Sequence, residues 1–142
     1  MDTVSPATRT RMMSAVRGKD TKPERVVRAM LWAMGHRYRL QARDLPGRPD
    51  IVFRGRRAAV FVHGCFWHAH GAARCPGARM PKSNTAFWRA KLDANTARDA
   101  RAKAALKAMG WRVMTVWECR LKTEAGRAAT GRALAKFLTA AR

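Results

Sequence analysis

A short stretch of the chain concentrates the side chains that most readily bind a transition metal. Residues 63–70 read His-Gly-Cys-Phe-Trp-His-Ala-His, and two more cysteines follow at Cys75 and Cys119. Zinc in structural sites takes four thiolate or imidazole ligands arranged as a tetrahedron. The residue types therefore predict a structural zinc site with one histidine ligand. Its predicted ligands are Cys65, His70, Cys75 and Cys119, with His68 as the alternative histidine.

One acidic residue stands at the start of an apolar run. Asp50 follows the turn-forming sequence Leu-Pro-Gly-Arg-Pro of residues 45–49, in a chain that has only nine Asp and Glu residues. A carboxylate in this position suits a hard divalent cation such as Mg²⁺, which prefers oxygen ligands. The alternative is a carboxylate that only caps the turn.

Aromatic side chains form a third candidate group. Phe66 and Trp67 lie in a glycine-containing loop, and Trp88 lies near the start of a long helical pattern. Apolar side chains on a basic surface can enter a stack of bases and unstack it. The alternative for Trp88 is packing of the helix against the sheet, a role we expect for Trp111 and Trp117.

The charge of the chain points to a polyanionic partner. Thirty Lys and Arg residues face nine Asp and Glu residues, which gives a formal net charge of +21. Such a surface attracts nucleic acid through counterion release and electrostatic steering. Binding to a membrane surface would call for one strongly amphipathic basic helix, whereas the basic residues here run through the whole chain.

The sequence also indicates a compartment. Residues 1–11 lack the apolar segment of a secretory signal, and no run of about 18 apolar residues predicts a membrane span. Three cysteines without an export signal indicate reduced thiols or metal ligands rather than disulfides. We therefore expect the protein to lie in the cell interior, in the cytoplasm.

The elements that position these residues follow from periodicity and from turn-forming residues. A basic helix at the N-terminus is expected to carry Met13, as a wedge into DNA or as an ordinary core methionine. Ser83 is expected to cap the long helix, and Gly110 to end it. The predicted helices are 8–16, 23–34, 85–109 and 124–140, and the predicted strands are 38–40, 50–53, 58–62 and 111–117.

The order of these elements predicts an α/β sandwich with a central mixed sheet flanked by helices. We expect residues 1–142 to form a single domain, with residues 8–17 as an arm that contacts DNA. Residues 64–82 have no predicted regular structure, and the zinc site would tie this loop to the end of the last strand.

Together these features resemble the very-short-patch mismatch-repair endonucleases, the Vsr family. The resemblance extends from about residue 7 to residue 122. Its carriers are Ala7-Thr8-Arg9 with Met13, Glu24, the segments 45–50 and 63–68, Pro81-Lys82-Ser83, Phe87-Trp88 with Lys91, Asn95, Arg98-Asp99, and the segment 110–119.

The resemblance implies a variant of the restriction-endonuclease fold and a magnesium-dependent DNA endonuclease. The implied reaction is a nick on the 5′ side of the T in a T:G mispair, left by deamination of 5-methylcytosine, which starts very-short-patch repair. Double-stranded DNA carrying this mispair is the implied substrate. The resemblance also implies other mismatch-repair proteins as partners and a bacterial-type location in the cytoplasm, associated with the nucleoid. We expect the chain to be a monomer.

The resemblance also implies roles for individual residues. Asp50 would bind Mg²⁺ together with the main-chain carbonyl of Val62, and Glu24 would hold water beside the metal. His68 would be the general base, with His63 assisting near the scissile phosphate. Met13, Phe66, Trp67 and Trp88 would intercalate, and the other implied DNA contacts are Arg9, Arg11, Lys82 and Lys91.

Two other functions are weighed against this one. The first is a zinc-containing module that binds DNA without cutting it, and the presence of both Asp50 and His68 argues against it. The second is another nuclease of the same fold with a different target. That nuclease would carry a second acid and a lysine after Asp50, where this chain has Phe61 and His63.

Overall fold

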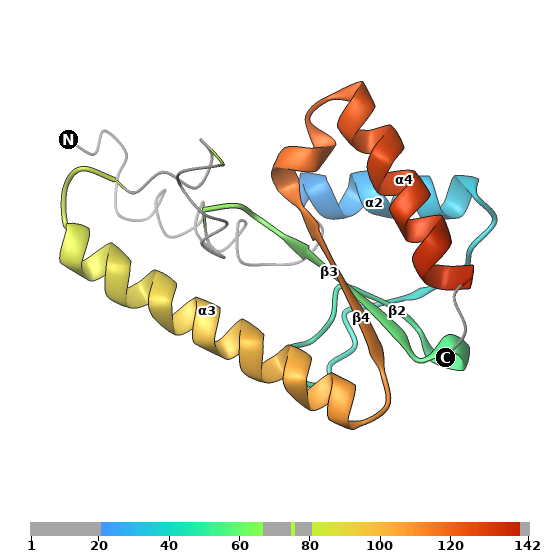
Figure 1. The fold of residues 1–142 in the computed structure, drawn as a ribbon, viewed down its shortest axis with the longest axis horizontal. Coiled ribbons are helices and arrows are strands. Elements are labelled where there is room, and N and C mark those ends of the chain that lie inside the picture. Colours follow the sequence, from blue (N-terminus) through green and yellow to red (C-terminus); the bar gives the residue numbers. More distant parts are fainter. Residues whose placement is uncertain (1–20, 67–74, 76–80, 140–142) are drawn as a thin grey trace.

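The computed structural model describes residues 21–66, 75 and 81–139. Within these residues a four-stranded sheet has the order β1-β2-β3-β4 (Figure 1). The strands are β1 (Arg39–Leu40), β2 (Ile51–Phe53), β3 (Ala58–His63) and β4 (Arg112–Trp117). The β1–β2 and β2–β3 pairs are antiparallel, and the β3–β4 pair is parallel. The predicted mixed sheet is therefore confirmed.

Three helices cover the two faces of the sheet. They are α2 (Lys22–Ala33), α3 (Thr85–Ala108) and α4 (Glu124–Thr139). In Figure 1 the sheet is seen close to edge-on, with α3 on one side and α2 and α4 on the other. The predicted α/β architecture, a sheet flanked by helices, is confirmed.

Alternation along β3 explains why helices are needed on both faces. Successive strand residues point to opposite faces of a sheet, and every residue of β3 is buried. Val60 and Val62 pack in one core with Val27 and Leu31 of α2. The α4 residues Leu134 and Leu138 join this core, with Phe137 partly buried against it. These three residues therefore form the side of α4 that faces the sheet.

The second core lies under α3. Here Ala59 and Phe61 of β3 pack with Leu106 of α3, and Trp111 packs partly buried against them. Trp111 therefore has the packing role expected from the sequence. Trp117 instead packs against the cysteines Cys65 and Cys75.

Local signals explain where the helices begin and end. The Thr21 hydroxyl accepts a hydrogen bond from the Glu24 N–H at 3.4 Å, which caps the start of α2. Gly35 and Gly110 follow α2 and α3 with φ of 88° and 86°, values that glycine adopts without strain. The predicted termination of both helices is confirmed.

The expected cap of α3 was wrong. Asn84, with φ of 54°, holds the N-cap position instead of Ser83, and its side chain makes no capping hydrogen bond. Asparagine tolerates the left-handed conformation better than serine, so the turn geometry, rather than hydroxyl capping, decides where α3 begins. Two short 3₁₀ helices, η1 (Arg54–Arg56) and η3 (Glu118–Leu121), follow β2 and β4 and were not predicted.

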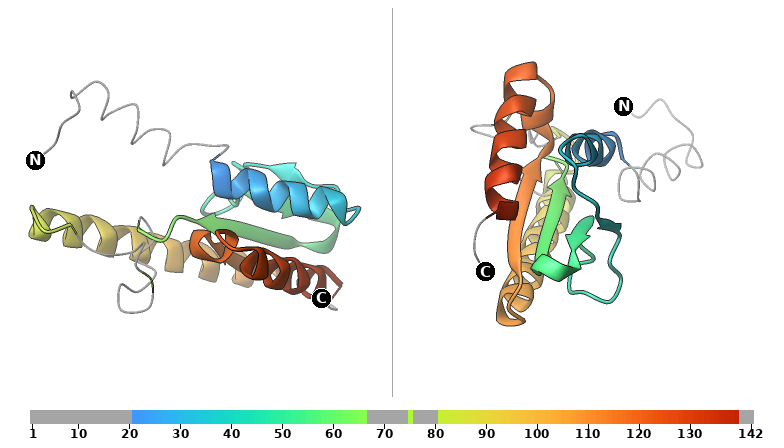
Figure 2. Two further views of the ribbon diagram at one scale, coloured as in Figure 1. Left: turned by 90° about the horizontal axis from the view of Figure 1, so that it is seen from above. Right: turned by 90° about the vertical axis from the view of Figure 1, so that its right-hand side faces the viewer.

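Helix α3 extends beyond the strands at its N-terminal half, which is seen from above in Figure 2. Its buried residues are Leu92, Ala102 and Leu106. None of the helices in the described part of the chain is long and apolar enough to cross a membrane. The predicted helix at 8–16 lies outside the described residues.

Candidate active site and metal centre

Two acids from different elements meet at one end of the sheet. Glu24 lies in the first turn of α2 and is only 4% exposed. Asp50 directly precedes β2, and its Oδ2 accepts a hydrogen bond from the Val62 N–H at 2.7 Å. The antiparallel register that pairs Ile51 with Val60 brings Asp50 to this part of β3. The structure thus brings together Glu24, Asp50 and Val62, as the resemblance implied.

Gln41 joins this group, and the sequence analysis missed it. Its side-chain Nε2 donates to Glu24 Oε2 at 3.2 Å, and its main-chain N–H donates to the Asp50 carbonyl at 3.1 Å. The residue follows β1, whose Leu40 pairs with Ile51, so Gln41 comes opposite Asp50. The sequence signal for Gln41 would have been the pairing of β1 with β2, because this pairing brings Gln41 to Asp50, nine positions further along the chain.

Burial dominates the electrostatics of the acid pair. The pKa of Asp50 is raised to about 7, mainly by burial and also by the nearby Glu24 carboxylate. Hydrogen bonds from the Val62 N–H and the Gln41 side chain act in the opposite direction. Two neighbouring carboxyl groups removed from water disfavour the second negative charge. A bound cation would reverse this effect.

The turn before Asp50 is wedged between the sheet and α3. A Cβ atom at Gly47 would lie 2.5 Å from the Ala102 Cβ and 3.2 Å from the Phe61 ring. Gly47 also has φ of 75°, and the Arg48 N–H donates to the Leu45 carbonyl at 3.1 Å. Only glycine fits this close approach, which holds the turn, and with it Asp50, against the helix.

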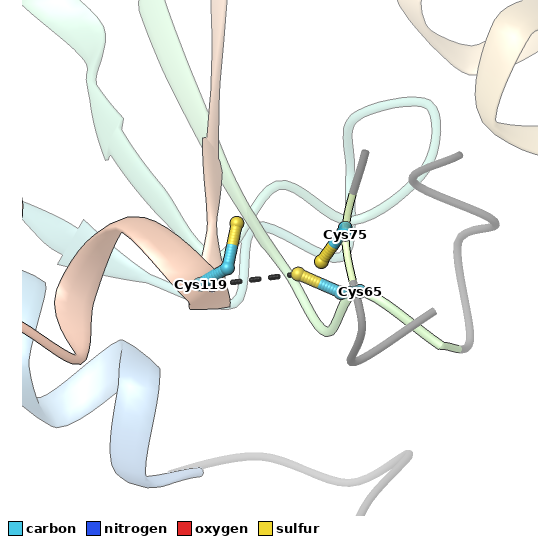
Figure 3. A group of neighbouring side chains, drawn as sticks. All are labelled: Cys65, Cys75 and Cys119. Atoms are coloured by element: carbon cyan, nitrogen blue, oxygen red, sulfur yellow. Dashed lines mark hydrogen bonds between the residues drawn. The ribbon is translucent and has the colours of Figure 1, made fainter. Parts of the chain in front are cut away.

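Three thiols form a second cluster, shown in Figure 3. The Sγ atoms of Cys65, Cys75 and Cys119 all lie within 4.8 Å of one another. The Cys119 N–H donates to Cys65 Sγ at 3.4 Å, and no disulfide joins the three. Burial raises the pKa of the Cys65 thiol to about 12, so a thiolate here needs a positive charge beside it. Of the predicted zinc ligands, the structure brings these three together.

His63 occupies the end of β3 as a packed ring. It is 3% exposed, and its centroid lies 5.6 Å from Phe61 and 5.2 Å from Trp117. Since His63 follows Val62 directly, it lies beside the strand position that contacts Asp50. Phe61, which occupies the position of a second acid in the usual nuclease pattern, is buried in the core under α3.

Aromatic rings gather where the loop after β3 meets the start of α3. Phe66 and Trp88 contact each other edge to face, with centroids 5.4 Å apart. Phe87 makes a similar contact with Trp88 at 5.2 Å and is 59% exposed. The structure therefore brings together two of the predicted intercalating residues, Phe66 and Trp88. It adds Phe87, which could have been found from its position next to Trp88 in the sequence.

Several predicted site residues lie outside the described part of the chain. Two of the implied DNA contacts lie within the described part: Lys82 is exposed, and Lys91 is half-buried. The predicted residues outside the description are Arg9, Arg11, Met13, Trp67, His68 and His70.

Comparison with known proteins shows which family the chain is similar to. The model of the family described as "DNA mismatch endonuclease Vsr" matches residues 1–74. A type II nicking enzyme of Xanthomonas oryzae, V.XorIIP, is 52% identical over 84% of this chain and 86% of its own length. The DNA mismatch endonuclease Vsr of Escherichia coli is 40% identical over 85% of this chain and 76% of its own length.

The chain belongs to the Vsr family of DNA mismatch endonucleases. It is therefore a DNA hydrolase, and DNA is its partner. The resemblance seen in the sequence is confirmed, and a nuclease of this kind implies a divalent metal ion.

The donors present in this Vsr chain fit two different metals. The carboxylates of buried Glu24 and partly buried Asp50 supply the oxygen ligands that a hard divalent cation prefers. The three sulfurs of the cysteine cluster could hold a softer metal ion. The two donor sets come from different side chains, so each site can be tested separately.

The Vsr chain also carries basic residues around the turn that precedes Asp50. Arg48, Arg98 and Arg101 line an open hollow between the turn before Asp50 and α3, together with Gly47 and Ala102. All three arginines are exposed. An arginine side chain presents several N–H donors to a phosphate group, so this hollow suits the backbone of a nucleic acid.

Proposed function

We propose that this protein nicks double-stranded DNA on the 5′ side of the T in a T:G mispair, and so starts very-short-patch repair of deaminated 5-methylcytosine. The observation that carries the proposal is the pair of carboxylates formed by buried Glu24 and partly buried Asp50, beside Val62. Phe66 follows Val62 by four residues, so its backbone lies within about 14 Å of that strand end. Cleavage and mismatch recognition would thus take place side by side.

We propose Mg²⁺ as the cation at the acid pair. The Asp50 carboxylate and the main-chain carbonyl of Val62 would bind it, and Glu24 would hold water next to it. When bound, Mg²⁺ would offset negative charge on the phosphate and on the leaving oxygen. The N–H of Val62 already fixes one Asp50 oxygen, which holds the carboxylate in place to receive the cation.

Histidines would take up the proton of the attacking water. We propose that His68 accepts the proton of the attacking water as its oxygen bonds to phosphorus, while the bond from phosphorus to the leaving oxygen breaks. A neutral imidazole suits this task because its pKa lies near 7. His63, packed at the end of β3, would assist near the scissile phosphate.

Mismatch recognition would use the aromatic rings. We propose that Phe66, Trp67 and Trp88 enter the stack at the mispair, with Met13 opposing them from the other groove. A mispaired step unstacks at a lower cost than a paired one, so insertion favours mismatched sites. The edge-to-face contact between Phe66 and Trp88 supports a shared wedge, because each ring limits the motion of the other.

The cysteine cluster would stabilise the loop that carries these residues. We propose that it binds zinc, with His70 completing the four ligands. Cys65 directly precedes Phe66, and Cys119 follows β4, so the metal would fasten the wedge and His68 to the sheet. Arg9, Arg11, Lys82 and Lys91 would contact the DNA backbone.

A strand-resolved nicking assay tests this function. Duplexes that differ only in one pair, T:G, G:C or A:T, would carry separate labels on the two strands. The expected result is a single nick, on the strand with the mispaired T and on its 5′ side, that depends on added Mg²⁺.

The same assay distinguishes the other two functions. A protein that binds the T:G duplex tightly and cuts neither strand would be a binding module. Equal cleavage of all three duplexes, or cleavage of both strands, would instead indicate a nuclease of the same fold with another target.

A further inference from the structure

Gln41 contacts both acids of the candidate active site. Its side chain donates to Glu24 at 3.2 Å, and its main-chain N–H donates to the Asp50 carbonyl at 3.1 Å. One neutral residue thus links the acid of α2 with the acid that precedes β2.

The backbone of Gln41 is unusual for its residue type. Its φ of 50° lies in the left-handed region, which costs about 1–3 kcal/mol for a residue other than glycine. Such conformations persist where the surroundings determine them, and they cluster at functional sites. Here the main-chain bond to Asp50 and the side-chain bond to Glu24 hold the residue in place from two sides.

The chemistry of an amide suits a site that must receive a cation. Its two N–H donors can satisfy carboxylate oxygens without cancelling their charge. An Arg or Lys at this place would neutralise the acids and compete with a cation, whereas an apolar residue would leave buried carboxylate oxygens without a donor. A glutamine therefore orients the acids and leaves their charge available.

We propose that Gln41 is a positioning residue of the nicking reaction: its side-chain amide holds the Glu24 carboxylate and its main-chain N–H holds the backbone of Asp50, so that the two acids keep the arrangement that receives the divalent cation. The inference rests on the proposed function of this acid pair. Gln41 acts through the two acids and has no contact with the DNA in this account.

The test uses the full chain with Gln41→Met, which keeps the length of the side chain and removes both donors. Binding of Mn²⁺ without DNA is measured by electron paramagnetic resonance, next to zinc content, melting temperature and affinity for a T:G duplex. The control is Arg57→Met, which places methionine at another left-handed position, with φ of 49°, away from the acids.

We expect Gln41→Met to bind Mn²⁺ about 10-fold more weakly, at the lower end of the loss typical for a residue that orients metal ligands. Nicking should recover at high Mn²⁺, while zinc content and duplex affinity stay unchanged. Arg57→Met should bind Mn²⁺ as the unmodified protein does. Unchanged Mn²⁺ affinity in Gln41→Met would overturn the inference.

A second variant keeps the inference testable if methionine prevents folding. Gln41→Asn keeps an amide and tolerates the left-handed backbone, but its side chain is one methylene too short to reach Glu24. It should also weaken Mn²⁺ binding, and wild-type affinity would count against the account. Asp50→Asn distinguishes a failure of the Gln41 inference from a failure of the proposed function. If Asp50→Asn binds Mn²⁺ and nicks normally, the proposed metal site itself is wrong.

Discussion

The Asp50 carboxyl group combines a position at the start of a strand with a pKa of about 7, raised first by burial. The protonated form is therefore favoured by folding. Its stabilising contribution is complete below the ordinary pKa of 3.8 and is lost as the pH rises to about 7. Binding of a cation to the ionised form opposes that loss.

This linkage predicts how Asp50→Asn behaves without added divalent cation. The amide stays neutral at every pH, so above pH 7 the variant should be more stable than the unmodified protein by about 2 kcal/mol. Near pH 4 the difference should almost vanish. Thermal melts across this range provide the measurement, and a difference that does not change with pH would contradict the raised pKa.

The cysteine cluster gives a second prediction for single residues. Cys119→Ala should lose the metal, which we expect at about one zinc per chain in the unmodified protein. A loss of about 3 kcal/mol would lower the melting temperature by roughly 6–12 °C. Metal analysis of the purified proteins measures the zinc directly.

Metal analysis of two histidine variants identifies the fourth zinc ligand. His70→Ala should lose zinc, whereas His68→Ala should keep zinc and lose nicking activity. The opposite pattern would exchange the roles of the two histidines, and unmodified active protein without zinc would refute the site.

At the scale of elements, the turn before Asp50 depends on its contact with α3. In Gly47→Ala the new Cβ atom would lie 2.5 Å from the Ala102 Cβ, on a backbone with φ of 75°. The turn must shift, at a cost of about 1–3 kcal/mol. Because a shift of about 1 Å at a reacting group can cost about 100-fold in rate, the nicking rate should fall along with stability.

Two variants control for this effect, and both are followed by melting temperature and single-turnover nicking rate. Gly55→Ala adds the same methyl group where nothing lies within 4 Å, and should be harmless. Gly47→Ala combined with Ala102→Gly removes the clash but not the positive φ, and should recover part of the rate. A nicking rate in Gly47→Ala equal to that of Gly55→Ala would mean that the turn does not position Asp50.

The sequence predicted the described elements better than their interactions. Helices α2, α3 and α4 and all four strands follow periodic patterns and glycine stops that act over a few residues. The cap of α3 was missed because Asn84 adopts a left-handed conformation that a preference for hydroxyl caps does not anticipate. Gln41 was missed because its importance depends on the register of β1 against β2, which no local pattern contains.

The site residues also divide into those that the local sequence predicts and those that only the folded chain reveals. Cys65, Cys75 and Cys119 could be grouped from their type alone, because few other side chains suit a soft metal. Glu24 came only from resemblance to a known family, since an acid in the first turn of a helix is also an ordinary helix-stabilising residue. Its burial beside Asp50 is a property of the folded chain.

For the whole molecule, the net charge of +21 predicts binding that weakens steeply with salt. If about six phosphates are contacted, the log–log slope of affinity against salt should be near −5. Arg101→Gln, in the basic hollow beside α3, should reduce the slope by about 1. Arg132→Gln, on α4 across the sheet, should leave it unchanged. A nearly flat salt dependence, or equal effects of the two variants, would place the DNA elsewhere.

The central claim is that one molecule recognises a mispair and cuts beside it with the Asp50 site. Single-turnover nicking of a strand-labelled T:G duplex, by the unmodified protein and by Asp50→Asn at equal occupancy of the DNA, tests it most directly. We expect one nick 5′ to the mispaired T with the unmodified protein, and none with Asp50→Asn, although the variant should bind the duplex and keep its zinc. Normal nicking by Asp50→Asn, or equal nicking of T:G and G:C duplexes by the unmodified protein, would contradict it.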